Sequence, residues 1–133
     1  MSEPESISAR KYDLLDRLID FGSRVLDVAE ALPSNRVGNH IAGQLVRSGT
    51  APAANYSEAQ SAESRSDFLH KIKIALKELR ETAVWLTFIR RRTLVKSPER
   101  LDAVAKECQE LIAILVASVS TAERNREAGP RGS

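Results

Sequence analysis

The 133-residue chain has few of the features that cross-link secreted proteins or anchor membrane proteins. Its one cysteine, Cys108, has no partner for an intrachain disulfide, which excludes a disulfide-stapled secreted scaffold. The longest apolar run without a charge, Leu111 to Val119, is much shorter than the roughly 20 residues that span a bilayer. The N-terminal segment MSEPESISARKYD lacks the apolar core of a signal peptide. We therefore expect a soluble, cytoplasmic protein without a membrane partner.

Proline and glycine, which interrupt helices, are also scarce, at 5 and 6 copies. Hydrophobic residues make up 42% of the chain and charged residues 29%, a balance typical of globular proteins rather than disordered ones. The formal net charge of +2 does not by itself require a nucleic acid or an anionic membrane as partner. We expect one helical domain over residues 1–126 and a disordered tail over 127–133.

The clearest helix lies between Ser64 and Lys96. Ser64 can accept a hydrogen bond from an amide of the first turn, and cations near residues 90–92 suit the negative end of the helix dipole. The apolar residues of one face recur at steps of three and four: Phe68, Ile72, Ala75, Leu79, Leu86 and Ile89. These features predict a long amphipathic helix.

Three further helices are predicted around it. The first, capped by Ser6 or Ser8, ends before Pro33 and is followed by a short connection over 34–38. The second runs over 39–62, with a kink at Pro52 because proline removes the amide that would bond the carbonyl of Ser48. The fourth begins at Pro98, ends near residue 126 and buries Cys108 as an inert thiol. Short connections favour antiparallel neighbours, so we predict an all-α, up-down-up-down antiparallel four-helix bundle.

A polar stripe at helical spacing follows the second helix and is either a hydrogen-bonded seam or a solvated surface. Its main members are Gln44, Arg47, Asn55 and Glu58.

Catalytic and cofactor motifs are missing. Neither His40 nor His70 belongs to the Glu-x-x-His motif of di-iron bundles, and no nucleotide-binding or nucleophile motif is present. We expect a protein that is not an enzyme and has no cofactor. A metal-dependent enzyme built on Glu58, Glu78 and Glu81 is kept as a weaker hypothesis.

The middles of three predicted helices carry no charge, over 48–57, 82–89 and 111–121. Such runs place apolar side chains on every face, whereas a small bundle buries one face of each helix. The surplus predicts burial against another subunit, through Trp85, Phe88, Ile112 and Val116. The alternative is a set of scattered exposed apolar residues, which is common.

A basic cluster surrounds the turn between the third and fourth helices: Arg90, Arg91, Arg92, Lys96 and Arg100. In a closed ring this cluster would repeat around one rim and suit the phosphates of RNA or DNA. Because no aromatic residue stands among the cations, such binding would be sequence-tolerant and salt-sensitive. The alternative is that these cations are simply solvated at a helix end.

Residues 40–86, HIAGQLVRSGTAPAANYSEAQSAESRSDFLHKIKIALKELRETAVWL, resemble a family of four-helix bundle proteins that includes those encoded within bacterial 23S rRNA intervening sequences. The matching positions are Gln44, Arg47, Ser48, Asn55, Glu58, Glu63, Phe68, Lys71, Ala75, Glu78, Glu81 and Trp85. The chain is also similar to the accessory variability protein of diversity-generating retroelements, a basic pentameric bundle that binds nucleic acid and a reverse transcriptase.

The resemblance implies a bundle that assembles as a ring, typically a homopentamer, with no established catalytic activity. It favours a scaffold associated with nucleic acid or ribonucleoprotein. A protein–protein interaction module with no nucleic-acid role is the alternative.

Overall fold

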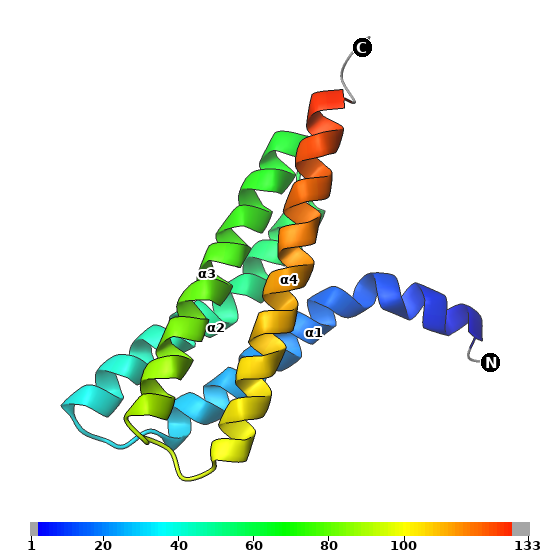
Figure 1. The fold of residues 1–133 in the computed structure, drawn as a ribbon. Helices are drawn as coiled ribbons and strands as arrows, with labels where there is room; N and C mark the ends of the chain where they lie inside the picture. Colours follow the sequence, from blue (N-terminus) through cyan, green and yellow to red (C-terminus); the bar gives the residue numbers. More distant parts are fainter. Residues whose placement is uncertain (1–2, 129–133) are drawn as a thin grey trace.

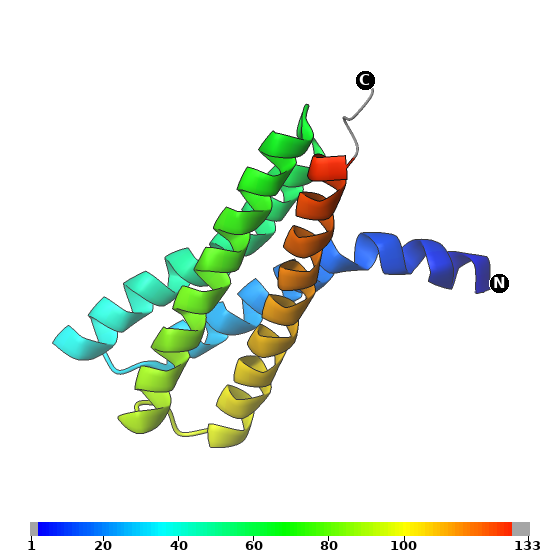
Figure 2. The ribbon, with the colours of Figure 1, turned by 45° about the horizontal axis from the view of Figure 1, so that its top comes forward.

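The computed structural model describes residues 3–128 and, within them, the side chains of residues 14–125. These residues form four helices and no strand: α1 (Glu3–Ala31), α2 (Arg36–Gln60), α3 (Arg65–Arg91) and α4 (Pro98–Ala128). The α1–α2 and α3–α4 connections lie at one end of the molecule and the α2–α3 connection at the other (Figure 1), so successive helices alternate in direction. Figure 2 shows the same alternation from a second side. The predicted all-α four-helix bundle is confirmed.

The two ends of the chain differ from the prediction in detail. Helix α1 begins at Glu3, before the predicted cap at Ser6 or Ser8, and its first turns project away from the other helices (Figure 1). Helix α4 extends to Ala128, and residues 129–133 of the predicted tail lie outside the described residues.

The core is formed by one stripe from each helix. The predicted stripe of α3 is buried except for Phe68, which is partly buried. Leu18 and Phe21 of α1, Leu45 of α2 and Leu111 of α4 are fully buried against it. Full burial of such a side chain contributes about 1.5–3 kcal/mol, so this shared stripe is the main source of stability.

Helix α2 begins one turn earlier than predicted. The side chain of Asn35 accepts a hydrogen bond from the amide of Gly38 at 2.9 Å, which caps the helix before Arg36. Gly38 was expected in the connection, but it is a buried helical residue beneath Pro33. A Cβ atom at Gly38 would lie 1.9 Å from the carbonyl oxygen of Pro33. Glycine is therefore required there for close packing.

Helix α2 continues through Pro52, which is fully buried. The hydroxyl of Thr50 donates to the carbonyl of Val46 at 2.7 Å rather than to the carbonyl of Ser48. The hydroxyl oxygens of Ser48 and Thr82 are 2.9 Å apart, and both residues are completely buried. This hydrogen bond joins α2 to α3 inside the core. The kink at Pro52 stays a prediction.

Ion pairs join the outer edges of the helices. The Nε atom of Arg17 on α1 lies 2.6 Å from Glu107 on α4, and its second nitrogen lies 2.8 Å from Glu110. The two ion pairs of Arg17 join α1 to α4. The part of α1 before this contact departs from the bundle (Figure 1).

Candidate functional site

The turn between α3 and α4 carries the predicted basic cluster. The amide of Leu94 donates to the carbonyl of Ile89 at 3.0 Å, and the amide of Thr93 donates to the carbonyl of Arg90 at 3.1 Å. This is the Schellman ending of a helix, which needs a residue in the left-handed conformation. Thr93 takes it, at φ 52°, although glycine is the usual residue and a β-branched residue is strained there.

All five cations lie in or beside the α3–α4 turn, but they differ in their partners. Arg90 forms an ion pair with Asp102, and Arg100 reaches Asp27 at 3.8 Å. The other three cations are exposed, and none has an ion-pair partner within residues 14–125: Arg91, Arg92 and Lys96. These three are therefore available to an external anion.

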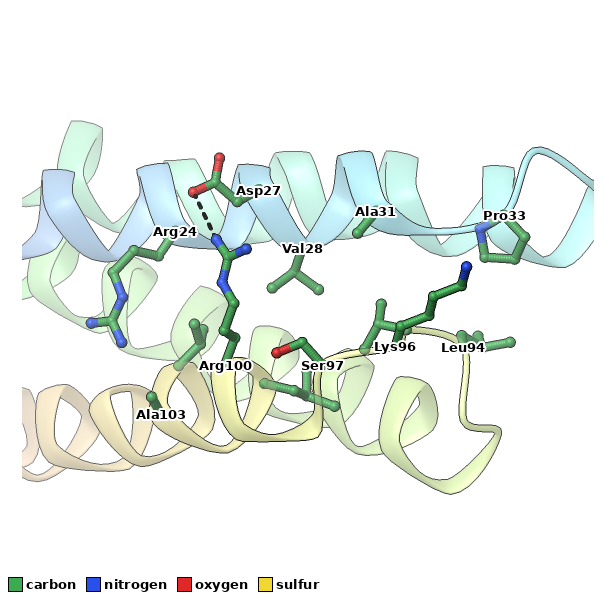
Figure 3. Close-up of a pocket in the computed structure, with 13 residues that line it drawn as sticks. Arg24, Asp27, Val28, Ala31, Pro33, Leu94, Lys96, Ser97, Arg100 and Ala103 are labelled. Atoms are coloured by element: carbon green, nitrogen blue, oxygen red, sulfur yellow. Dashed lines mark ion pairs between the residues drawn. The ribbon is translucent and has the colours of Figure 1, made fainter.

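A cavity of about 480 Å³ lies beside the basic cluster, between the last turns of α1 and the first turns of α4 (Figure 3). Its apolar walls come from three elements and include Val28, Leu94, Leu101 and Val104. Its polar groups are Arg24, Asp27, Lys96, Ser97 and Arg100. The cluster thus borders a concave apolar surface, which the sequence analysis did not predict.

The predicted polar stripe of α2 is a hydrogen-bonded seam against α3 in its first half. The guanidinium of Arg47 lies 2.8 Å from Glu78 and 3.3 Å from the side-chain oxygen of Gln44, and it also pairs with Glu81. The indole of Trp85 donates to Glu81 at 3.0 Å. The hydrogen bond from Arg47, and then that from Trp85, lowers the pKa of Glu81.

The second half of the stripe is looser. Glu58 pairs with Lys71 at 2.7 Å, and Asn55 donates to the carbonyl of Ala51 within its own helix at 3.0 Å. The carboxylates of the metal hypothesis, Glu58, Glu78 and Glu81, are thus held by cations. Within the described residues, no group of three or more His, Cys, Asp and Glu could hold a metal ion.

The four residues of the predicted subunit interface do not form one patch. The ring of Trp85 lies 5.7 Å from that of Phe88 and 5.8 Å from that of His40, on the α2 side of α3. Val116 instead lines a shallow depression between α4 and Lys77 of α3. Ile112 is partly buried against the core.

Other exposed apolar side chains were not predicted from the sequence. Val84 is 53% exposed, one turn from the 50% exposed Phe88 on α3. Ile19 on α1 and Val46 on α2 are 52% and 42% exposed. Val84 lies in one of the charge-free runs, whereas Ile19 and Val46 each follow a buried leucine in a segment that also carries charges, so the sequence did not single them out.

Cys108 is fully buried and donates to the carbonyl of Leu79 at 3.3 Å. Burial raises its pKa to about 12, so the thiol is protonated at neutral pH. Among the described helices, none is both apolar enough and long enough to cross a membrane.

Comparisons with known proteins agree with the fold. Residues 10–117 match the model of the 23S rRNA-intervening sequence protein family. The chain is similar to the crystal structure of a protein of unknown function from the S23 ribosomal protein family of Bacteroides thetaiotaomicron, at 30% identity and a TM-score of 0.73. That match covers 80% of this chain and 97% of that chain. No curated protein was found to match. The family match covers most of the chain, and the chain belongs to the 23S rRNA-intervening sequence protein family.

Proposed function

We propose that this protein is a non-enzymatic, homo-oligomeric scaffold of the cytoplasm that binds nucleic acid, or a ribonucleoprotein, through the basic cluster. The observation that carries the proposal is the exposure of Arg91, Arg92 and Lys96 without ion-pair partners among the described residues, all at one end of the bundle. Exposed cations that contact phosphates release counterions, which gives affinity without sequence preference.

Assembly would strengthen this binding. The exposed Val84 and Phe88 supply apolar surface for contacts between subunits. Family resemblance favours a ring, with a pentamer as the expected form. In a ring, each copy adds its own exposed cations to one rim, so a weak site on one subunit becomes a multivalent one.

Fluorescence anisotropy with a labelled structured RNA and a labelled DNA duplex tests the site. The triple variant Arg91→Ser, Arg92→Ser, Lys96→Ser should bind more weakly and show a flatter salt dependence between about 50 and 200 mM, because fewer phosphates are neutralised. The matched control removes three cations elsewhere: Lys77→Ser, Arg80→Ser and Arg124→Ser. Equal losses in both variants, or no loss in the first, would contradict the proposed site.

A protein–protein interaction module without a nucleic-acid role is the second candidate. The exposed side chains of Val84 and Phe88, with the Trp85 ring packed beside Phe88, favour it, since aromatic residues are enriched at protein interfaces. In this case a partner captured by the tagged protein should survive nuclease treatment and be lost with Val84→Ser and Phe88→Ser. Loss of the partner on nuclease treatment would instead support the scaffold that binds nucleic acid.

A further inference from the structure

We propose that the cavity between α1 and the α3–α4 turn binds a small molecule with an apolar body and one carboxylate. This inference does not depend on nucleic-acid binding. It rests on the shape of the cavity, its apolar walls and the cations at its mouth.

The cavity has the size and lining of a small-molecule site. Its volume of about 480 Å³ falls within the range of ligand pockets, which are mainly apolar with a few polar groups. Val28 projects into the middle of the space from α1, with Leu94 on the opposite side (Figure 3). Leu101 and Val104 complete the apolar wall from α4. A polar or highly charged molecule would have few partners on these walls.

The charges at the mouth select an anion. Lys96 and Arg100 stand on either side of Val28, and Arg24 lies further along α1 (Figure 3). Asp27 is the one carboxylate of the lining. Its contact with Arg100 is long, at 3.8 Å, and both side chains are exposed to solvent. Such a contact is weak, so a ligand carboxylate can replace it. Asp27 also disfavours ligands with several negative charges.

Isothermal titration with octanoate and with 1-octanol tests the charge preference on the full chain. Octanoate should bind about tenfold more tightly, and Lys96→Gln with Arg100→Gln should reduce this preference to about threefold or less while leaving octanol binding unchanged. Asp27→Asn should strengthen octanoate binding, because it removes the one repulsive charge. Equal affinities for octanoate and octanol in the wild type, or no binding of either, would overturn the proposal.

Two substitutions test the location. Ala31 and Ala103 are exposed residues of the cavity wall, so Ala31→Trp or Ala103→Trp should fill the space without disturbing the core. Each should abolish octanoate binding, whereas Ala113→Trp, at an exposed position of α4 outside the cavity, should not. Binding that persists in both filled variants would place the ligand elsewhere and overturn the proposal.

The same variants separate this inference from the proposed function. Ala103→Trp should leave RNA binding intact, and Arg91→Ser with Arg92→Ser should leave octanoate binding intact. Loss of RNA binding in the filled variant would mean that the cavity is part of the nucleic-acid surface, and it would overturn the assignment of a separate ligand.

Discussion

Adding one methyl group at Gly49 should destabilise the bundle, whereas adding the same group at Gly43 of the same helix should stabilise it. A Cβ atom at Gly49 would lie 2.4 Å from Cγ1 and 2.9 Å from Cβ of Val25 on α1. A Cβ atom at Gly43 would meet nothing within 4 Å. Both substitutions add the same methyl group to the same helix. They differ only in what that group would contact.

The sizes of the two effects follow from this geometry. In an exposed helix, alanine is about 0.8–1.0 kcal/mol more favourable than glycine, which is the expected gain for Gly43→Ala. At Gly49 this gain is opposed by overpacking, which costs about 1–3 kcal/mol. The upper half of that range applies, because the Cβ of Val25 is itself in the way and no side-chain rotation moves it. Gly49→Ala should thus lower the free energy of unfolding by about 1–2 kcal/mol. The free energies of unfolding of the two variants should then differ by about 2–3 kcal/mol.

Thermal and urea unfolding followed by circular dichroism measures both variants. A difference of 2–3 kcal/mol corresponds to roughly 6–15 °C in Tm for a domain of this size. All samples need the same protomer concentration, because assembly raises the apparent stability. In a double variant, Val25→Ala removes Cγ1 but keeps Cβ at 2.9 Å, so it should relieve part of the clash. Gly49→Ala should therefore lower the free energy of unfolding less in that background than in the wild type. A Gly49→Ala protein as stable as the wild type would refute the close packing of α1 on α2.

Three further predictions concern other parts of the bundle. Thr93→Gly should raise the free energy of unfolding by about 1 kcal/mol in urea melts, because glycine adopts the left-handed conformation without strain; an unchanged value would contradict that strain. Glu81→Gln should lower the free energy of unfolding by about 0.5–1 kcal/mol at pH 7, because it removes the ion pair with Arg47. Arg47 lowers the pKa of Glu81, so this contribution is complete above the ordinary carboxyl pKa, near 4.3, and is lost as the pH falls through the lowered pKa; a cost that persists at pH 2 would argue against the ion pair. The thiol of Cys108 should react with iodoacetamide only after denaturant is added, as mass spectrometry can show, because it is buried and protonated.

Helix boundaries with local chemical signals were predicted well. Ser64 caps α3 by accepting from the amide of Asp67 at 3.0 Å, and α4 begins at Pro98. Both signals act within one turn of the chain. The predicted start of α2 was wrong because glycine occurs both in connections and where two segments pack closely. Gly38 was placed in the connection, but it is a helical residue that permits close packing on Pro33. Only the contact between the two segments distinguishes these uses.

The candidate site was predictable where its residues are neighbours in sequence. Arg91, Arg92 and Lys96 lie in or beside the short turn between α3 and α4. The cavity was not predictable, because Arg24 and Asp27 reach it from α1 through the packing of distant helices. The same reason explains why Trp85 and Val116 face different sides. Periodicity identifies the buried face of each helix but not which exposed residues of two helices adjoin.

The most direct test of the scaffold proposal is the mass in solution, measured by light scattering at low and high salt and again with a short structured RNA. The proposal predicts a stable multiple of the 14.7 kDa chain, near five copies, whose mass increases when RNA is added at low salt. The triple variant at Arg91, Arg92 and Lys96 should keep the protein mass but lose the increase with RNA. A monomer at all concentrations, or an oligomer whose mass does not respond to RNA, would contradict the account.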